Sequence, residues 1–143
     1  MHGLLSSHLD RPSVTLVKEA SIPHHDEAAV HLVTTSTLAW LRERAPGVPI
    51  DERRFRPNLL VDTGSSPCLA EETWIGDHVR IGDVELEILR RAQRCVMVDL
   101  PCADLPPARG LFKTIVTHNE RMLGVHARVV RGGVIRAGAH VTC

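Results

Sequence analysis

The sequence has no apolar run close to the roughly 20 residues that an α-helix needs to cross a bilayer. It also has no excess of either charge, because 17 basic and 17 acidic side chains give a formal net charge of zero at pH 7. The first residues lack the basic start and long apolar stretch of a signal peptide. These absences argue against membrane and nucleic-acid partners, and we expect a cytoplasmic protein that binds a small-molecule substrate.

Closely spaced cysteines are absent and lysines are scarce. The sequence holds no C-x-x-C pair, which argues against a zinc site and a disulfide framework; the four cysteines are Cys68, Cys95, Cys102 and Cys143. Lys18 and Lys113 are the only lysines, whereas arginine is abundant. A guanidinium forms two parallel hydrogen bonds to a phosphate or carboxylate more readily than an ammonium does, so the composition leans toward an anionic ligand.

Short runs of β-forming residues dominate the chain, whose length of 143 residues predicts one domain. The clearest pattern follows the Gly82-Asp83 turn, where Val84, Leu86 and Ile88 alternate with acidic residues, as is typical of an antiparallel hairpin. A similar alternation joins Leu123, Val125, Ala127 and Val129. We predict strands at 13–20, 28–35, 59–61, 78–81, 84–89, 90–100 and 122–141; Pro101 ends the sixth, and glycine turns interrupt the last.

Two helices interrupt these strands. The first is predicted between Thr35 or Ser36 as its N-cap and the stop signal Pro46-Gly47, and the second over residues 111–120. Many short strands joined by tight turns, with two or so short helices inserted, indicate a mainly β fold, a closed or nearly closed β-barrel.

Cys95 lies in the stretch "RRAQRCVMVDLPC", residues 90–102, and has two interpretations. A lone cysteine inside a β-run most often fills a core as a small hydrophobe. As a functional thiol it needs a nearby positive charge. Because strand alternation sends Arg94 to the opposite face, that charge has to come from elsewhere in the chain.

The stretch "DERRFRPN", residues 51–58, is the obvious source of that charge. Most charge runs are solvated loops, here paired with Asp51 and Glu52. However, Phe55 is an apolar anchor, and the rest of the run offers an anion clamp made of Arg54, Arg56 and Asn58.

A cluster of hydroxyl residues, Thr34, Thr35 and Ser36, stands where a predicted strand meets the first helix. These side chains are expected to cap the helix, and the backbone N–H groups of a helix start also bind phosphate. The two interpretations are compatible.

Taken together, these stretches resemble the MOSC domain, named for the C-terminal domain of molybdenum cofactor sulfurase and shared with the mitochondrial amidoxime-reducing component. The ordered set is "VHLVTTSTLAWL", "DERRFRPNLLVDTG", "EETWIGDHVRIGDVELEILRRAQRCVMVDLP" and "LGVHARVVRGGVIRAGAHV". The resemblance covers residues 9–143 and leaves residues 1–8 as an N-terminal tail. It implies a MOSC-type β-barrel whose cleft binds the pyranopterin molybdenum cofactor.

The resemblance also implies roles for single residues. Cys95 matches the second cysteine of the family's C-x-R-C pattern, whose thiolate is a molybdenum ligand in reductase members. The R-P-N unit at 56–58, with Arg54 before it, and the hydroxyl cluster at 34–36 would hold the pterin and its phosphate. Ala92 replaces the first cysteine of the pattern, which argues against a redox pair. Two-domain members carry an N-terminal β-rich domain that is not expected here, so three alternatives stay open: an open site, a site shared with a separate partner, or a degenerate site.

Two classes of function follow from this resemblance. The first is a molybdenum cofactor protein that reduces N-hydroxylated compounds with electrons from a separate donor protein, or that carries sulfur for the cofactor as a Cys95 persulfide. The alternative is a noncatalytic module that stores cofactor or completes a split enzyme. The family label of pyridoxal phosphate binding belongs to the sulfurase's separate enzyme domain, and neither Lys18 nor Lys113 has the context of a Schiff-base lysine. We therefore expect no direct binding of pyridoxal phosphate.

Overall fold

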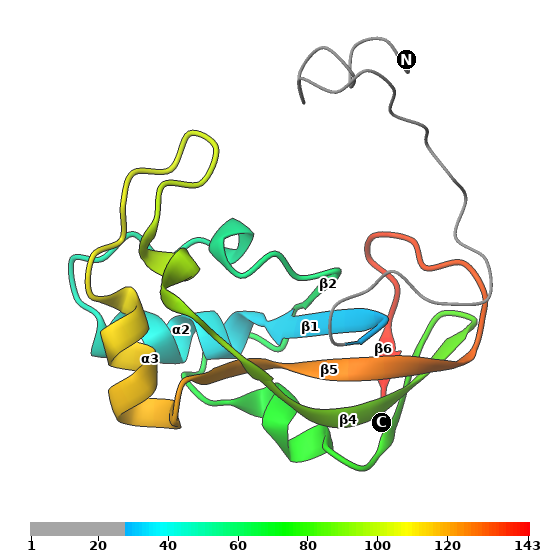
Figure 1. Cartoon of the computed structure of the whole chain (residues 1–143). Coiled ribbons are helices and arrows are strands. Elements are labelled where there is room, and N and C mark those ends of the chain that lie inside the picture. The colour runs from blue at the N-terminus through cyan, green and yellow to red at the C-terminus, as the bar shows by residue number, and fades with distance from the viewer. Residues whose placement is uncertain (1–27) are drawn as a thin grey trace, which may run out of the picture.

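The computed structural model describes residues 28–143, and the predicted tail at 1–8 and the predicted strand at 13–20 lie outside them (Figure 1). Neither helix in the described part is long and apolar enough to cross a membrane. The elements in chain order are β1 Val30–Thr34, α2 Thr35–Arg44, η1 Glu52–Arg54, β2 Leu59–Val61, η2 Ala70–Trp74, β3 His78–Ile81, β4 Val84–Gln93, η3 Val96–Asp99, α3 Leu111–Asn119, β5 Met122–Arg131 and β6 Val141–Thr142, where η marks a 3₁₀-helix.

The strands of residues 28–143 form one six-stranded sheet in the order β2-β1-β5-β4-β3-β6. Every neighbouring pair is antiparallel except β1 and β2. The sheet curls so that its two edge strands line one cavity. The lining of this cavity includes Leu59, Leu60 and Val61 from β2 and Val141 from β6. The prediction of a nearly closed β-barrel with two short helices is therefore confirmed.

The inside of the barrel is filled by the alternating apolar residues of the strands. The predicted hairpin is present, since Ile81 and Val84 are partners across the Gly82-Asp83 turn. Inward residues are buried and Glu85 and Glu87 point outward, which is the period of two that a half-buried strand requires. The buried residues of this core are Leu32, Val61, Val79, Ile81, Val84, Leu86, Ile88, Val125 and Ala127.

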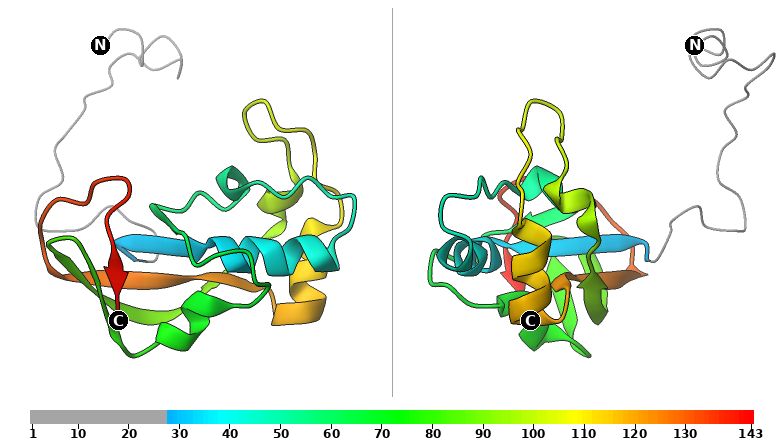
Figure 2. Two further views of the ribbon diagram at one scale, coloured as in Figure 1. Left: turned by 180° about the vertical axis from the view of Figure 1, so that it is seen from behind. Right: turned by 60° about the vertical axis from the view of Figure 1, so that its left-hand side comes forward.

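A second core lies at the end of the barrel where α2 and α3 sit together, as Figure 2 shows. Its buried residues are Val33, Leu38, Trp40, Leu41, Phe55, Val98, Ala108, Leu111, Ile115 and Leu123. The N-cap of α2 is Thr34, whose hydroxyl accepts from the N–H of Thr37 at 3.2 Å. The predicted caps, Thr35 and Ser36, lie one and two residues farther along the chain. Thr34 is the cap because it is the last residue of β1, held extended by pairing with Val61 of β2.

The predicted strand at 90–100 is wrong beyond Gln93. Gln93 is the last residue of β4 that pairs with β5, and the N–H of Arg94 then bonds the carbonyl of Arg121 at 2.8 Å. The chain turns into η3 directly after Cys95, so strand alternation does not govern the faces of Arg94 and Cys95. The alternation also fails at Val129, which is 47% exposed, and residues 134–135 are not a strand.

Gly124 permits the close approach of β5 to β1. Its φ of +79° lies in the left-handed region, and a Cβ there would stand 2.6 Å from Nε2 of His31 and 2.8 Å from the carbonyl oxygen of Leu32. We predict that Gly124→Ala lowers the free energy of unfolding by about 2–4 kcal/mol, measured by urea denaturation. The matched control is Gly132→Ala, where a Cβ meets nothing within 4 Å. Equal stability of the two variants would contradict the prediction.

Candidate functional site

A cavity of about 690 Å³ lies on the outer face of β1 and β5, and we call it the Cys95 cavity. One side is formed by Arg54, Phe55 and Arg56, and the other by the end of β4, η3 and the loop that follows. Its volume falls in the range that small-molecule sites occupy, about 300–1,000 Å³. The full lining is Ala28, His31, Arg54, Phe55, Arg56, Gln93, Arg94, Cys95, Met97, Val98, Leu100, Pro101, Cys102 and His126.

Cys95 is exposed and lines this cavity, so the interpretation of this residue as a core hydrophobe is wrong. All four cysteines are free thiols, and Cys102 lines the same cavity. Within residues 28–143, no group of three or more histidine, cysteine or acidic side chains is arranged to hold a metal ion. The cavity is therefore lined by one exposed thiol, Cys95, by the half-buried Cys102 and by His31 and His126, but these side chains do not form a protein-only metal centre.

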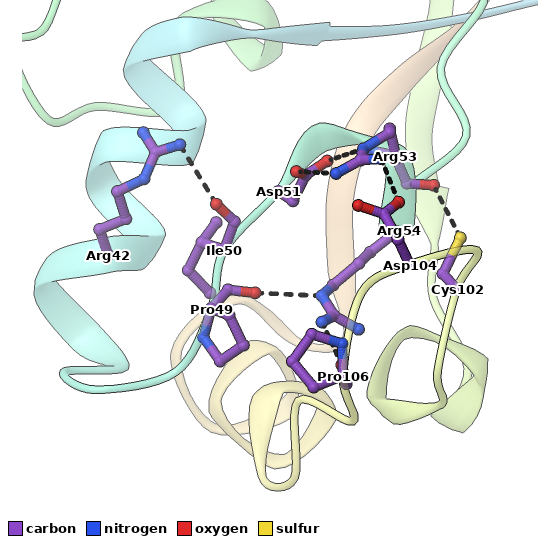
Figure 3. Close-up of polar contacts among 9 residues, drawn as sticks. All are labelled: Arg42, Pro49, Ile50, Asp51, Arg53, Arg54, Cys102, Asp104 and Pro106. Carbon is purple, nitrogen blue, oxygen red and sulfur yellow. Dashed lines mark hydrogen bonds and ion pairs between the residues drawn. The ribbon is translucent and has the colours of Figure 1, made fainter.

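Arg54 is the buried member of the arginine run. Its guanidinium donates to the carbonyls of Pro49 at 3.0 Å, of Leu100 at 3.1 Å and of Pro106. Figure 3 shows the bonds to Pro49 and Pro106. Only 5% of Arg54 is exposed. The recorded hydrogen bonds of this side chain thus join loops of the protein, although it lines the cavity.

Arg53 and Arg56 differ from Arg54 because both are exposed. Arg53 forms ion pairs with Asp51 and Asp104, and its hydrogen bonds lower the pKa of Asp51 to about 2. The pairing with Asp51 agrees with the solvated-loop interpretation. Arg56 lines the cavity with a φ of +51°, and the structure of residues 28–143 records no hydrogen bond or ion pair for its guanidinium. Arg56 is therefore available to an anionic group.

Arg94 connects the two sides of the cavity. Its guanidinium donates to the carbonyl of Leu123 at 2.9 and 2.8 Å and to the carbonyl of Phe55 at 3.2 Å. Because Phe55 precedes Arg56 and Arg94 precedes Cys95, this last bond brings the thiol and the available guanidinium to one cavity. The sequence analysis assigned Arg94 no role, and no local pattern predicts a contact across 39 residues.

His31 and His126 form the floor of the cavity. They are cross-strand partners of β1 and β5, with ring centroids 5.6 Å apart. Nε2 of His31 is in hydrogen-bond contact with the guanidinium of Arg94. Burial, and then the charge of Arg94, lowers the pKa of His31 from 6.5 to about 3, so this imidazole is neutral near pH 7. Sequence reasoning missed both histidines, since only the strand register places them side by side.

The hydroxyl cluster lines neither this cavity nor the cavity between β2 and β6. Thr34 and Ser36 are buried, with Thr34 donating to Oε2 of Glu71 at 2.6 Å. Thr35 donates to Oδ1 of Asp62 at 3.0 Å and to the carbonyl of Gly64 at 2.9 Å. In this structure the three hydroxyls therefore contact protein groups.

Asn58 is held next to β1. Its Oδ1 accepts from the N–H of His31 at 2.7 Å, and its own N–H donates to the carbonyl of His31 at 2.8 Å. Asn58 lines the cavity between β2 and β6, so the structure brings Arg54, Arg56 and Cys95 together but places Asn58 at the neighbouring cavity.

Glu71 is the fully buried carboxyl beneath the hydroxyl cluster. Thr34 and Thr37 both donate to its Oε2, while its Oε1 has no hydrogen-bond partner among the described residues. Burial raises the pKa of Glu71 above its ordinary value of 4.5, against the effect of the two hydroxyls. The folded protein therefore favours the neutral acid at this position.

Glu71→Gln tests this assignment. Above pH 4.5 the unfolded chain ionises Glu71 before the folded chain does, so wild-type stability falls as the pH rises toward the folded pKa. Glutamine does not titrate, and its carbonyl accepts the same two hydroxyls. We predict that the stability difference, variant minus wild type, increases with pH above 4.5 in urea denaturation series. A difference that stays constant with pH would contradict a buried neutral Glu71.

His31→Gln should have the opposite dependence on pH. Below pH 6.5 the unfolded chain binds a proton at His31 and the folded chain does not until about pH 3, so wild type loses stability on acidification. We predict that this group lowers the wild-type free energy of unfolding by at most about 1.4 kcal/mol for each pH unit of acidification. The variant should not show this decrease. The measurement is urea denaturation from pH 7 to pH 4, with His118→Gln, at an exposed histidine, as the control. Identical slopes in wild type and His31→Gln would refute it.

Comparisons with solved structures agree with the architecture. YiiM from Geobacillus stearothermophilus superposes with a TM-score of 0.56 at 21% identity, over 80% of this chain and 53% of that one. YiiM from Escherichia coli gives a TM-score of 0.56 at 16% identity with the same coverage. At these identities the likeness concerns the fold alone.

Sequence comparisons give the family. Mitochondrial amidoxime-reducing component 1 of Danio rerio is 29% identical over 140 residues, which is 87% of this chain and 39% of the relative. Mitochondrial amidoxime reducing component 2 of Rattus norvegicus is 32% identical over 88 residues, or 60% of this chain and 24% of the relative. The chain thus spans less than half the length of these relatives. The MOSC domain model matches residues 19–142, and this chain belongs to the MOSC domain family.

Proposed function

We propose that this chain binds the molybdenum cofactor in the Cys95 cavity and acts in the reduction of N-hydroxylated compounds. MOSC domains are associated with this cofactor, and the relatives from Danio rerio and Rattus norvegicus are both named for amidoxime reduction. The observation that carries the proposal is the meeting of an exposed thiol, Cys95, with the available guanidinium of Arg56 in one cavity of about 690 Å³.

The donor set of the cavity fits the cofactor. A thiolate is a soft ligand and suits a metal with sulfur-rich coordination. A guanidinium pairs with a phosphate through a planar fork, so Arg56 matches the anionic end of the cofactor. The remaining lining supplies apolar side chains such as Met97 and Val98, which exclude water from a bound ring system.

Each residue of the cavity then has a distinct task. Cys95 would hold the metal, and Arg56 would bind the phosphate. Arg94 would fix the position of both through its bond to the Phe55 carbonyl. The neutral imidazole of His31 keeps Arg94 in place without adding a second charge. When bound, the cofactor supplies two-electron redox chemistry.

Reduction of an N-hydroxyl group to an amine consumes two electrons and two protons and releases water. The electrons would come from a separate donor protein, and residues outside this chain would complete the site, since the matched relatives are more than twice as long. Sulfur carriage is the second candidate, and the exposure of Cys95 favours it because a persulfide has to reach its acceptor. A noncatalytic storage module would bind the cofactor without either activity.

The test is the molybdenum content, by mass spectrometry, and the pterin fluorescence of protein from a cofactor-making host. We expect near-stoichiometric loading of wild type and a loss of at least about tenfold in molybdenum for Cys95→Ala. The control is Cys68→Ala, because Cys68 is exposed but lines neither cavity.

The outcomes separate the candidates. Loaded wild type that reduces an amidoxime with a supplied electron donor supports the reductase. Cyanide-releasable sulfur that depends on Cys95 supports sulfur carriage instead. Loaded protein with neither property supports storage, and wild type without metal and pterin refutes binding by this chain alone.

A further inference from the structure

A projecting hairpin, residues 100–107, forms one wall of the Cys95 cavity. It joins η3 to α3 and stands out from the body of the molecule in Figure 1. Cys102 and Leu105 exchange two backbone hydrogen bonds of 3.2 and 2.8 Å, which close the tip around Ala103 and Asp104. Leu100, Pro101 and Cys102 line the cavity, so the position of this hairpin sets the width of the opening.

The base of the hairpin is fixed from within. Arg54 donates to the carbonyl of Leu100 on one leg and to that of Pro106 on the other, and also to Pro49 in the body of the protein. This guanidinium is buried, and breaking its bonds would leave a buried charge without partners. The base therefore does not move readily.

The tip is held differently, by the exposed neighbour of Arg54. Nη1 of Arg53 lies 2.7 Å from Oδ1 of Asp104, and Figure 3 shows both arginines reaching the hairpin from the same segment. The two side chains are 47% and 77% exposed. Among residues 28–143, the tip is also linked to the body by the weak contact of the Cys102 thiol with the carbonyl of Arg53 at 3.8 Å. An exposed ion pair of this kind is weak and is screened by salt.

We infer that the Arg53–Asp104 ion pair determines the size of the molecule that reaches Cys95. With the pair formed, the tip stays against η1, and this wall keeps the opening at the width seen in the structure, in which Cys95 is exposed. With the pair broken, the tip turns on the fixed base and the opening widens. The inference rests on the proposed function only for the identity of the substrate, because access to the thiol is a property of the chain itself.

Alkylation of Cys95 tests this with two uncharged reagents, small iodoacetamide and bulky N-(1-pyrenyl)maleimide, and with each cysteine resolved by tandem mass spectrometry. The ratio of the alkylation rate with the bulky reagent to that with the small reagent reports the width of the opening. A change in local charge alters the reactivity of the thiol toward both reagents alike and so cancels in this ratio. We predict that Asp104→Asn raises this ratio about two- to fivefold at low salt. Asp104→Glu, which keeps the carboxylate, should stay near the wild-type ratio.

High salt tests the same ion pair in wild type, without a substitution. The wild-type ratio should rise toward that of Asp104→Asn as sodium chloride is raised to about 1 M, whereas the variant should respond little. Cys68, on a different loop, is the internal standard. The matched control is Glu87→Gln, which breaks the exposed pair with Arg128 on the barrel.

An unchanged ratio in Asp104→Asn and in high salt would overturn the inference. The assay needs no cofactor, so its failure is distinct from failure of the proposed function. Widened access in a chain that comes from a cofactor-making host without molybdenum or pterin would support the role of the ion pair and refute cofactor binding by this chain alone.

Discussion

The hydrogen bond from Arg94 to the carbonyl of Phe55 is the contact on which the candidate site depends. Arg94 immediately precedes the exposed thiol of Cys95, and Phe55 immediately precedes the available guanidinium of Arg56. The same guanidinium also holds the carbonyl of Leu123 on β5, so the end of β4 and the arginine segment meet over one strand pair. The bonds from Arg54 to the carbonyl of Leu100 and from Arg53 to Asp104 join the same two segments farther from the thiol, so the Arg94 contact is the one made by the residues next to Cys95 and Arg56.

Arg94 can occupy this position because the strand pair beneath it leaves room. Gly124 has no side chain to meet His31, and His31 stays neutral beside the guanidinium. A protonated imidazole there would place two cations in contact at a buried position, which is unfavourable. The position of Arg94 therefore depends both on the close packing of β1 against β5 at Gly124 and on a neutral His31.

The three arginines of residues 53–56 have different contacts because the fold places each of them in a different environment. Arg54 is turned inward onto three carbonyls and stabilises loops. Arg53 faces solvent and pairs with carboxylates, and Arg56 faces the cavity. Phe55, buried in the second core, sets these directions because it anchors the segment between them.

The sequence by itself determined the barrel, since alternation such as Val84, Leu86 and Ile88 follows directly from the geometry of a strand with one buried face. It also placed the hairpin turn, the second helix and the stretches that carry Cys95 and the arginines. It could not determine that β4 ends at Gln93, because the residues after it are β-formers by composition, whereas in the fold the chain turns into η3 through the bonds from Val98 to Cys95 and from Leu100 to Met97. Nor could it show that Cys95 is exposed, that Arg54 faces inward, or that His31 lies beside His126. Those features depend on contacts between residues far apart in the chain, and local sequence patterns carry no information about such contacts.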